Sequence, residues 1–476
     1  MKVIEKMIDT ISPSWGLERR QAQLKLEHFE SVKRHYDGAS SSDRMKAWMP
    51  INKPGQYPDS GAIDLMASRV SYLYDNSAPV KRGINAISNY VFGPGCVPHA
   101  VKVDGKKNDK LEGILKDFVD TPACDIEGRE TLYTKQNQAG IHVPRDGAFL
   151  IQRVWVNDKN SPLPFKLKSL TQDHIDKSKT QIGNYGNRIV QGVEYNRRGE
   201  RVALWINDYL PNQHVSASVK SKRHKMADFC HPFRTTVAGQ VHGLTWGSPI
   251  IIKAKDFDDY MDAQLTRQKI SQCFVGLIHD LEGGSNDESK PMEGKIQPGT
   301  WMMAPEGKTV EFSQPPQVEG ISEYSKIQHL GIASGLEVPY MIVSSDFSDS
   351  NYTQSRMTLL DFARSIESYQ QHIFDPQMNY KIGQWIMEAA QLKGVNTFNT
   401  KLLWVYPRKE FVDPEKDMKA FALAVANGFM SWEMVVREMG HDPEDVAKSL
   451  QASKSAVGSL LPQLSKQIED KQNDAA

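Results

Sequence analysis

The feature that most constrains the fold of this chain is a pair of helix-forming stretches that flank an irregular segment. Residues 254–278 have apolar side chains at helical spacing, with aspartates near the start and basic residues later, which suits the helix dipole. Residues 281–320 are rich in Gly and Pro and contain two strand-like runs, TWMMA and TVEFS. Residues 321–335 return to helical spacing. We therefore expect an out-and-back unit made of a helix, an excursion and a returning helix.

On the N-terminal side of this unit, the sequence predicts short helices followed by strands. Apolar residues recur at helical spacing through residues 62–91, with an interruption at 76–79, so two short helices are expected. Between residues 141 and 206, β-branched and aromatic runs separated by Asn, Gly and Pro predict a β-rich domain. The string EYNRRGERVALWI predicts a hairpin with its turn at Asn196 to Gly199, because glycine can adopt a positive φ.

On the C-terminal side, a long helix is expected over residues 356–393, with one apolar stripe. Pro376 should kink this helix, because proline removes a backbone donor and clashes with the preceding turn. Residues 402–406 are typical of a strand, and residues 414–440 are typical of short helices. These elements together predict an α+β fold, and a chain of 476 residues is long enough for more than one structural unit.

The cysteines and the hydropathy of the chain exclude several classes of protein. The four cysteines, at positions 96, 124, 230 and 273, show no paired spacing, so neither a disulfide framework nor a structural zinc site is expected. The first residues make a poor signal peptide, because Glu5 and Asp9 interrupt their apolar run. No stretch approaches the roughly 18 uncharged apolar residues that a membrane span needs. A reducing cytoplasm is therefore the expected compartment.

The string EGKT at 306–309 resembles the end of a phosphate-binding loop, but its surroundings differ from that motif. The glycine that such a loop needs five positions before Gly307 is replaced by Met302. The motif also requires a helix to follow, whereas the residues that follow here, TVEF, favour a strand. We therefore expect a turn between strands.

Two further groups of polar residues fit structural roles better than metal binding. Four residues crowd together without the usual spacing of zinc ligands: His224, Cys230, His231 and His242. Four carboxylates follow one another on the expected helix without converging on one face: Asp256, Asp258, Asp259 and Asp262. The residues themselves thus predict no catalytic group, no cofactor and no metal.

Several strings, in a fixed order along the chain, resemble the lambda-type family of phage portal proteins. The N-terminal strings are YDGASSSDRMKAWMP and RVSYLYDNSAPVKRGINAISNYVFGPGCVP. MADFCHPFRTTVAGQVHGLTWGSPII resembles the stretch before the first stem helix, although Val237 and Ala238 stand where an Arg-Pro-like pair is expected. The most specific part of the resemblance, within residues 297–385, is IASGLEVPY followed by NYTQSR.

The resemblance implies a portal fold with a β-rich wing, a two-helix stem, an α/β clip, a long kinked channel helix and a helical crown. Carried onto this chain, it assigns an N-terminal arm (1–60), a wing (61–253), a first stem helix (254–278), a clip (279–321), a second stem helix (322–343), a tunnel loop (344–355), a channel helix with a strand (356–412), a crown (413–450) and a flexible tail (451–476).

The implied function is that of a ring subunit, in about twelve copies, at one capsid vertex, where double-stranded DNA is packaged and ejected. The implied partners are other copies of the chain, the major capsid and scaffolding proteins, the terminase motor, the head-tail connector and weakly bound DNA. The implied location is the virion, and the host cytoplasm during assembly. The candidate channel residues are Ser344, Ser345, Asp346, Ser348, Asp349, Ser350, Asn351, Tyr352 and Arg356. The candidate clip residues for docking the motor or connector are Trp301, Met303, Glu306 and Lys308.

Elementary geometry and charge agree with such a ring. About twelve helices packed roughly 8 to 10 Å apart place their axes on a circle with a diameter of about 31 to 38 Å. Subtracting one helix radius on each side leaves a bore with a diameter of roughly 21 to 28 Å. Lys plus Arg and Asp plus Glu both number 58, so no net charge holds DNA tightly. In the loop, serines can bond transiently to phosphate, whereas Asp346 and Asp349 repel it. Tyr352 and Arg356 either contact DNA or brace the loop, and Asn351 or Thr353 is also a suitable cap for the next helix.

Two other classes of function remain open at this stage. One is a catalytic component of the packaging machine, a nuclease or an ATPase, which the incomplete phosphate-binding loop and the scattered acids disfavour. The other is a monomeric nucleic-acid-binding module. Turnover of ATP or DNA by the pure protein would favour the first, and a steep salt dependence of DNA affinity in a monomer would favour the second.

Overall fold

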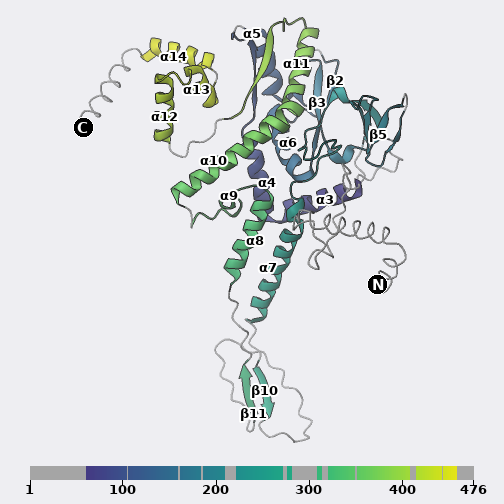
Figure 1. Ribbon diagram of the computed structural model, residues 1–476, viewed down its shortest axis with the longest axis vertical. Coiled ribbons are helices and arrows are strands. Elements are labelled where there is room, and N and C mark those ends of the chain that lie inside the picture. Colours follow the sequence, from purple (N-terminus) through teal and green to yellow (C-terminus); the bar gives the residue numbers. More distant parts are fainter. Residues whose placement is uncertain are drawn as a thin grey trace, which may run out of the picture. The chain divides into compact units, whose positions relative to one another are not determined.

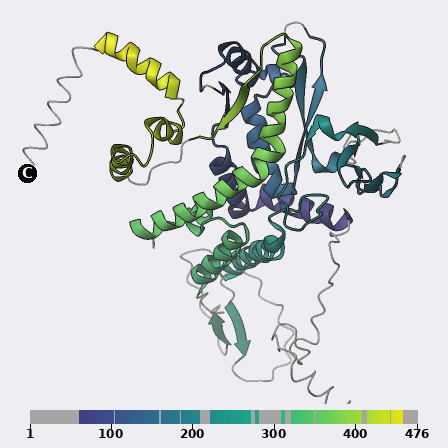
Figure 2. The same ribbon diagram turned by 45° about the horizontal axis from the view of Figure 1, so that its top comes forward.

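The computed structural model describes residues 60–103, 105–158, 161–183, 186–208, 221–271, 276–280, 308–312, 320–348, 351–407, 414–441 and 443–457 (Figures 1 and 2). All of them belong to one compact unit of the chain, Tyr57–Ala476. The helices are α3 (Ser60–Asn76), α4 (Ala78–Val91), α5 (Asp109–Val119), α6 (Leu132–Asp146), α7 (Ile251–Ser271), α8 (Ile321–Gly335), α9 (Tyr340–Ser344), α10 (Tyr352–Tyr369), α11 (Tyr380–Leu392), α12 (Pro414–Ala426), α13 (Trp432–Glu438) and α14 (Pro443–Val457). The strands are β1 (Val97–Lys102), β2 (Phe149–Trp155), β3 (Phe165–Thr171), β4 (Gln181–Ile182), β5 (Arg188–Val190), β6 (Val193–Tyr195), β7 (Arg201–Ile206), β8 (Lys222–Lys225), β9 (Phe229–Cys230), β10 (Gly276–Asp280), β11 (Lys308–Phe312) and β12 (Thr400–Val405).

The central core is built on α4 and α6. The expected helix pair within 62–91 is confirmed as α3 and α4, with Ser77 as the single residue between them. One side of α4 is fully buried, because apolar residues recur at the helical period: Val80, Ile84, Ile87 and Val91. A side chain on Gly140 of α6 would lie 2.4 Å from Ser88 Oγ, so the glycine is what permits the close approach of α6 to α4.

The long C-terminal helix is interrupted where its proline lies. Residues Gln370–Asn379 form a π-helix of 10 residues between α10 and α11, and Pro376 lies inside it. The wider π turn accommodates a ring that cannot donate a backbone hydrogen bond. Figure 1 shows the change of direction between α10 and α11. The buried face continues through the π-helix with Phe374 and into α11 with Trp385, whose Nε1 donates to the Ala227 carbonyl at 2.9 Å.

The strands form four small antiparallel sheets, with the orders β3-β2-β9, β4-β5-β6-β7-β8, β1-β12 and β10-β11. The predicted hairpin is confirmed as β6 and β7, whose turn is closed by a 3.0 Å bond from the Gly199 amide to the Asn196 carbonyl. Gly199 has a φ of +84°, as the turn requires. In β1-β12, segments about 300 residues apart in sequence pair from Val97↔Val405 to Lys102↔Thr400.

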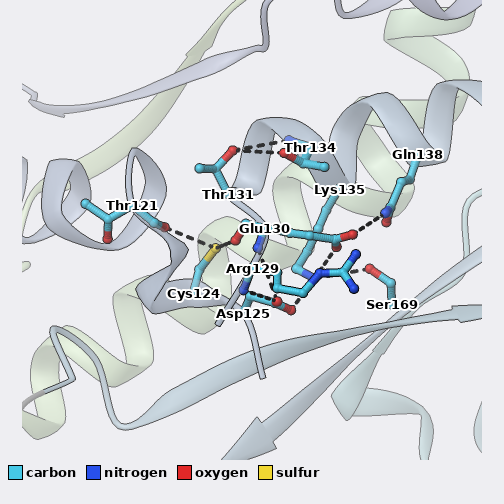
Figure 3. A network of polar contacts seen from close by, with 10 residues as sticks. All are labelled: Thr121, Cys124, Asp125, Arg129, Glu130, Thr131, Thr134, Lys135, Gln138 and Ser169. Atoms are coloured by element: carbon cyan, nitrogen blue, oxygen red, sulfur yellow. Dashed lines mark hydrogen bonds and ion pairs between the residues drawn. The ribbon is translucent and has the colours of Figure 1, made fainter. Parts of the chain in front are cut away.

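A buried ion cluster fixes the loop before α6 (Figure 3). The Lys135 side chain is 1% exposed, and its Nζ lies 2.7 Å from Asp125, 3.1 Å from Glu130 and 3.2 Å from Ser169 Oγ. Burial tends to raise the pKa of Asp125, but the bonds from Lys135 and from two backbone amides outweigh it and lower the pKa. The cluster therefore holds an ionised carboxylate inside the body, next to β3.

Three sequence-based expectations need correction. The helix expected to reach residue 278 ends at Ser271 among the described residues, and Gly276–Asp280 is a strand paired with Lys308–Phe312. Glycine weakens a helix, and the apolar residues beside it pack equally well in a strand, so the pairing decides the outcome. The tail expected from residue 451 begins too early, because α14 continues to Val457. The helices α5 and α6 were not predicted.

Candidate functional site

The helices α7 and α8 pack side by side, as Figures 1 and 2 both show. Their contact is partly aromatic: the Phe257 and His329 rings are 5.0 Å apart, and the Tyr260 and Tyr324 rings are 4.3 Å apart. Where the helices meet the body, a Cβ on Gly335 would lie 2.2 Å from the side chain of Ile250, so only glycine allows this approach. The two helices of the predicted out-and-back unit are thus observed as an antiparallel pair. The second helix, however, was expected over 322–343 and ends at Gly335, because Pro339 separates it from α9.

The helix pair keeps apolar side chains exposed on both of its faces. Rotating about 100° per residue from the contact residues places Met261 and Leu265 of α7 on one face. The same rotation along α8 places Ile327 and Leu330 on the opposite face. All four side chains are between 41% and 63% exposed. No described part of this chain fully covers the apolar side chains on either face.

The acidic residues of α7 do not form a binding centre. Asp259 pairs with Lys255 at 2.5 Å, one helical turn away on the exposed side. The pKa of Asp258 is raised by partial burial and by the neighbouring charges of Asp259 and Asp262. Within the described ranges, no group of three or more His, Cys, Asp or Glu residues is placed to hold a metal ion.

The loop that joins α9 to α10 is held by short-range hydrogen bonds. Ser344 Oγ donates to the Tyr340 carbonyl at 2.9 Å and accepts from the Asp346 amide at 3.1 Å. Asp346 accepts from the Ser348 hydroxyl at 2.6 Å and from its amide at 3.0 Å, and these bonds lower the pKa of Asp346. Ser345 adopts a left-handed conformation with a φ of +58°. Two further candidates, Asp349 and Ser350, lie outside the described residues.

The loop ends in a capped helix. Asn351 Oδ1 accepts from the Gln354 amide at 2.8 Å, so Asn351 is the N-cap of α10. Arg356, one turn into α10, donates to Tyr352 Oη at 3.4 Å and to Asp417 of α12 at 2.9 Å. The guanidinium therefore braces the helix start against the C-terminal helices. The partner Asp417 was not found from sequence, because nothing in the pattern links positions 61 residues apart.

Of the four candidate clip residues, the structure describes the backbone of one. Lys308 begins β11, where its register partner is Asp280. Because Lys308 and Thr309 are part of a strand, the EGKT string lacks the helix that a phosphate-binding loop requires. Trp301, Met303 and Glu306 lie outside the described residues.

Three of the four clustered His and Cys residues, Cys230, His231 and His242, are buried in the interior. His231 and His242 are buried, with ring centroids 6.2 Å apart. Desolvation lowers the pKa of both imidazoles, which keeps them neutral. Cys230 is a buried thiol beside the Met378 carbonyl, and His224 packs edge-on against Phe229. None of the described helices is long and apolar enough to cross a membrane.

Comparison with known proteins shows what class of protein has this architecture. A chain in the neck of a native GTA particle, computed with C12 symmetry, superposes with a TM-score of 0.50 at 13% identity, over 79% of this chain and 94% of that chain. A crystal structure of a HK97 family phage portal protein from Corynebacterium diphtheriae matches over 75% of this chain and 98% of that one, with a TM-score of 0.32 and 11% identity. This chain therefore shares its fold with the chain from the GTA neck.

Similarity in sequence shows the family to which this chain belongs. A probable portal protein of Halomonas phage phiHAP-1 is 22% identical over 399 residues, which is 78% of this chain and 76% of that relative. The family described as phage portal protein, lambda family, matches residues 41–370. The chain belongs to the lambda family of phage portal proteins. Its role is that of a phage portal, a structural component of the virion and not an enzyme.

Proposed function

We propose that about twelve copies of this chain form a closed ring at one capsid vertex, through which double-stranded DNA is packaged and ejected. The observation that carries this proposal is the helix pair α7 and α8, with its two opposite apolar faces. A ring in which each copy meets the next head to tail needs two different surfaces on every copy. The face with Met261 and Leu265 and the face with Ile327 and Leu330 meet this requirement.

The proposed channel lies along the helix pair and the loop 344–355, which is the tunnel loop of this proposal. Its described side chains are mostly small or acidic, with Phe347 and Tyr352 as large exceptions, and their hydrogen bonds are mostly made within the loop. Asp346 repels phosphate, while Arg356 is already engaged by Asp417. Such a surface touches DNA without holding it, in keeping with equal numbers of basic and acidic residues. DNA contact is thus sequence-independent and weak.

The remaining assignments follow the same proposal. The segment 279–321, which contains β11 and the end of its partner strand β10, is the clip that docks the terminase motor and later the head-tail connector. Residues 61–253 are the wing, and residues 413–450, with α12, α13 and the start of α14, are the crown. Major capsid and scaffolding proteins surround the ring during assembly in the host cytoplasm.

The ring is tested by replacing one exposed residue on each face of the helix pair. Purified full-length protein, alone and with the scaffolding and capsid proteins of the same phage, should give rings with a central hole in negative-stain microscopy. Ile327→Asp and Leu265→Asp should each abolish the rings, because a buried unpaired charge opposes the contact. Ile182→Asp, at a site 84% exposed in β4, serves as the matched control and should leave rings intact. Absence of rings from the wild type under both conditions, or intact rings in both stem variants, would overturn the proposal.

A further inference from the structure

Residues 231–249 connect strand β9 to helix α7 and pass through the interior of the body, and we call them the connecting segment. Two buried stretches of this segment flank an exposed turn. In the first stretch, the Gln377 side chain accepts from the Phe233 amide at 3.1 Å and donates to the Phe233 carbonyl at 3.0 Å. In the second, the Trp246 amide donates to the Pro144 carbonyl at 2.9 Å. The connecting segment therefore ties the start of the helix pair to the π-helix and to α6.

Each buried stretch contains one histidine, and the two imidazole rings are neighbours. The ring centroids of His231 and His242 are 6.2 Å apart, and the two residues are 3% and 0% exposed. His242 Nε2 lies 2.8 Å from the Gln191 carbonyl oxygen, which can only accept, so Nε2 carries the proton of the neutral ring. Among the described residues, His242 Nδ1 and both nitrogens of His231 have no hydrogen-bond partner. Neither ring therefore has an acceptor in place for the proton that would charge it.

Positive side chains surround the two imidazoles. Burial lowers the pKa of both rings, to about 3 for His242, and nearby cations lower it further. These cations come from three parts of the body: Arg201 of β7, Lys177 between β3 and β4, and Lys381 of α11. The carboxylates of the surrounding elements are engaged by other groups: Asp64 and Asp173 by Lys177, Asp146 by His142 and Arg145, Asp228 by Arg153, and Glu194 by Arg223. A proton on either imidazole would therefore be a buried charge without a counter-ion.

We propose that His231 and His242 make the connecting segment an acid-sensitive attachment, which holds the helix pair to the body at neutral pH and opens when the rings are protonated. In an open segment the imidazoles reach water, where histidine takes up a proton near about pH 6.5. The open state then binds protons that the closed state excludes, so acid shifts the equilibrium towards opening. The closed state is fully favoured above about pH 6.5 and loses this advantage as the pH falls towards the lowered values of the buried rings. This device belongs to the single subunit and does not depend on the proposed ring.

The opening is measured by hydrogen exchange in full-length wild-type protein at about pH 7.5 and about pH 5, after correction for the effect of pH on the chemistry of exchange. The amides of Phe233 and Trp246 report on the connecting segment, because both are hydrogen-bonded in the closed state. Their opening should increase about 30-fold at the lower pH if one ring is protonated, and about 1000-fold if both are. Amides of α4 and α11 should keep their protection. Asp125 does not interfere, because an exposed aspartate titrates below about pH 5.

Variants assign this acid response to the two rings. His242→Gln keeps an N–H that can donate to the Gln191 carbonyl but cannot take up a proton, so it should retain only the part of the response that comes from His231. His231→Leu removes a ring that makes no hydrogen bond to the described residues. The double variant should open equally at both pH values. His441→Gln, at an exposed histidine after α13, is the matched control and should respond as the wild type does.

The wild-type measurement alone can reject the inference, even where a variant fails to fold. Equal protection of the connecting segment at both pH values would rule it out. So would an acid response of the same size in α4 and α11, because the whole subunit would then be opening. A full response in the folded double variant would show that other groups are responsible. Loss of the response in the double variant, with His441→Gln unchanged, would support the assignment.

Discussion

The body around α4, α6 and α11 and the helix pair α7 and α8 are built from similar residues but are completed in different ways. In the body, the apolar stripes of α4 and of the long helix meet each other, and side chains such as Ile84 and Phe374 are entirely buried. In the helix pair, contacts within the chain use only part of each helix, and residues such as Leu265 and Ile327 stay exposed. The apolar core of the body is thus complete within one chain, whereas we expect other copies to cover the exposed apolar side chains of the helix pair.

The largest expected difference between the two regions lies in the cost of removing an apolar side chain. Phe374→Ala should lower the free energy of unfolding by about 3 to 5 kcal/mol, because it leaves a cavity in a packed core. Leu265→Ala in the helix pair should change the stability of the isolated subunit by less than about 0.5 kcal/mol. Urea unfolding followed by circular dichroism measures both. Equal losses would mean that the helix pair is already packed within one chain.

A second difference concerns ion pairs. Lys135→Ala leaves Asp125 buried without its cation, and we expect a loss of about 3 kcal/mol in the free energy of unfolding. The matched pair on the exposed side of α12, Lys419 and Glu415 at 2.7 Å, is open to solvent. Lys419→Ala should therefore cost at most about 0.5 kcal/mol. The same denaturation experiment separates the two variants, and a small effect at Lys135 would show that water reaches the cluster.

The pH dependence of stability sharpens this second comparison. The folded state lowers the pKa of Asp125, so the carboxylate contributes stability above its unfolded pKa. That contribution is lost as the pH falls from the unfolded value through the lowered folded value. Wild-type stability should therefore fall in acid more steeply than the stability of Lys135→Ala, whose Asp125 has lost the main cause of the shift. Parallel acid titrations of the two proteins would contradict the assignment.

Sequence patterns found the elements whose signals are local and missed those that depend on distant partners. The helices α3, α4, α7 and α8 follow from apolar spacing, and the turn of β6 and β7 follows from its Asn and Gly. Helix α6 was missed because Gly140 and Pro144 interrupt its pattern. Strand β10 was taken for the end of a helix, since a short apolar run fits both states until a partner strand is known.

In the candidate site, too, the sequence revealed the local features and not the contacts between distant residues. The cap at Asn351 was recognised as an alternative from sequence, because Ser, Thr, Asp and Asn are the residues that cap helices. The exposure of Met261, Leu265, Ile327 and Leu330 could not be read from sequence, since apolar spacing does not say whether a face is covered by the same chain. The bond from Arg356 to Asp417 also required coordinates, because it joins two helices through space.

An effect smaller than those of Phe374→Ala and Lys135→Ala is expected in the loop that joins α9 to α10. Asn351→Ala removes the side-chain bond to the Gln354 amide, which should cost about 1 kcal/mol at the first turn of α10. The loss should be local, because Arg356 still ties that turn to Asp417. Hydrogen exchange should therefore become faster at the start of α10, while amides of α4 and α11 keep their protection. Asn427→Ala, beyond the end of α12, is the matched control at an exposed asparagine. If Asn351→Ala accelerated hydrogen exchange throughout the body, the loop would be packed as part of the core. It would then not separate the body, whose core is complete within one chain, from the helix pair, whose apolar side chains stay exposed.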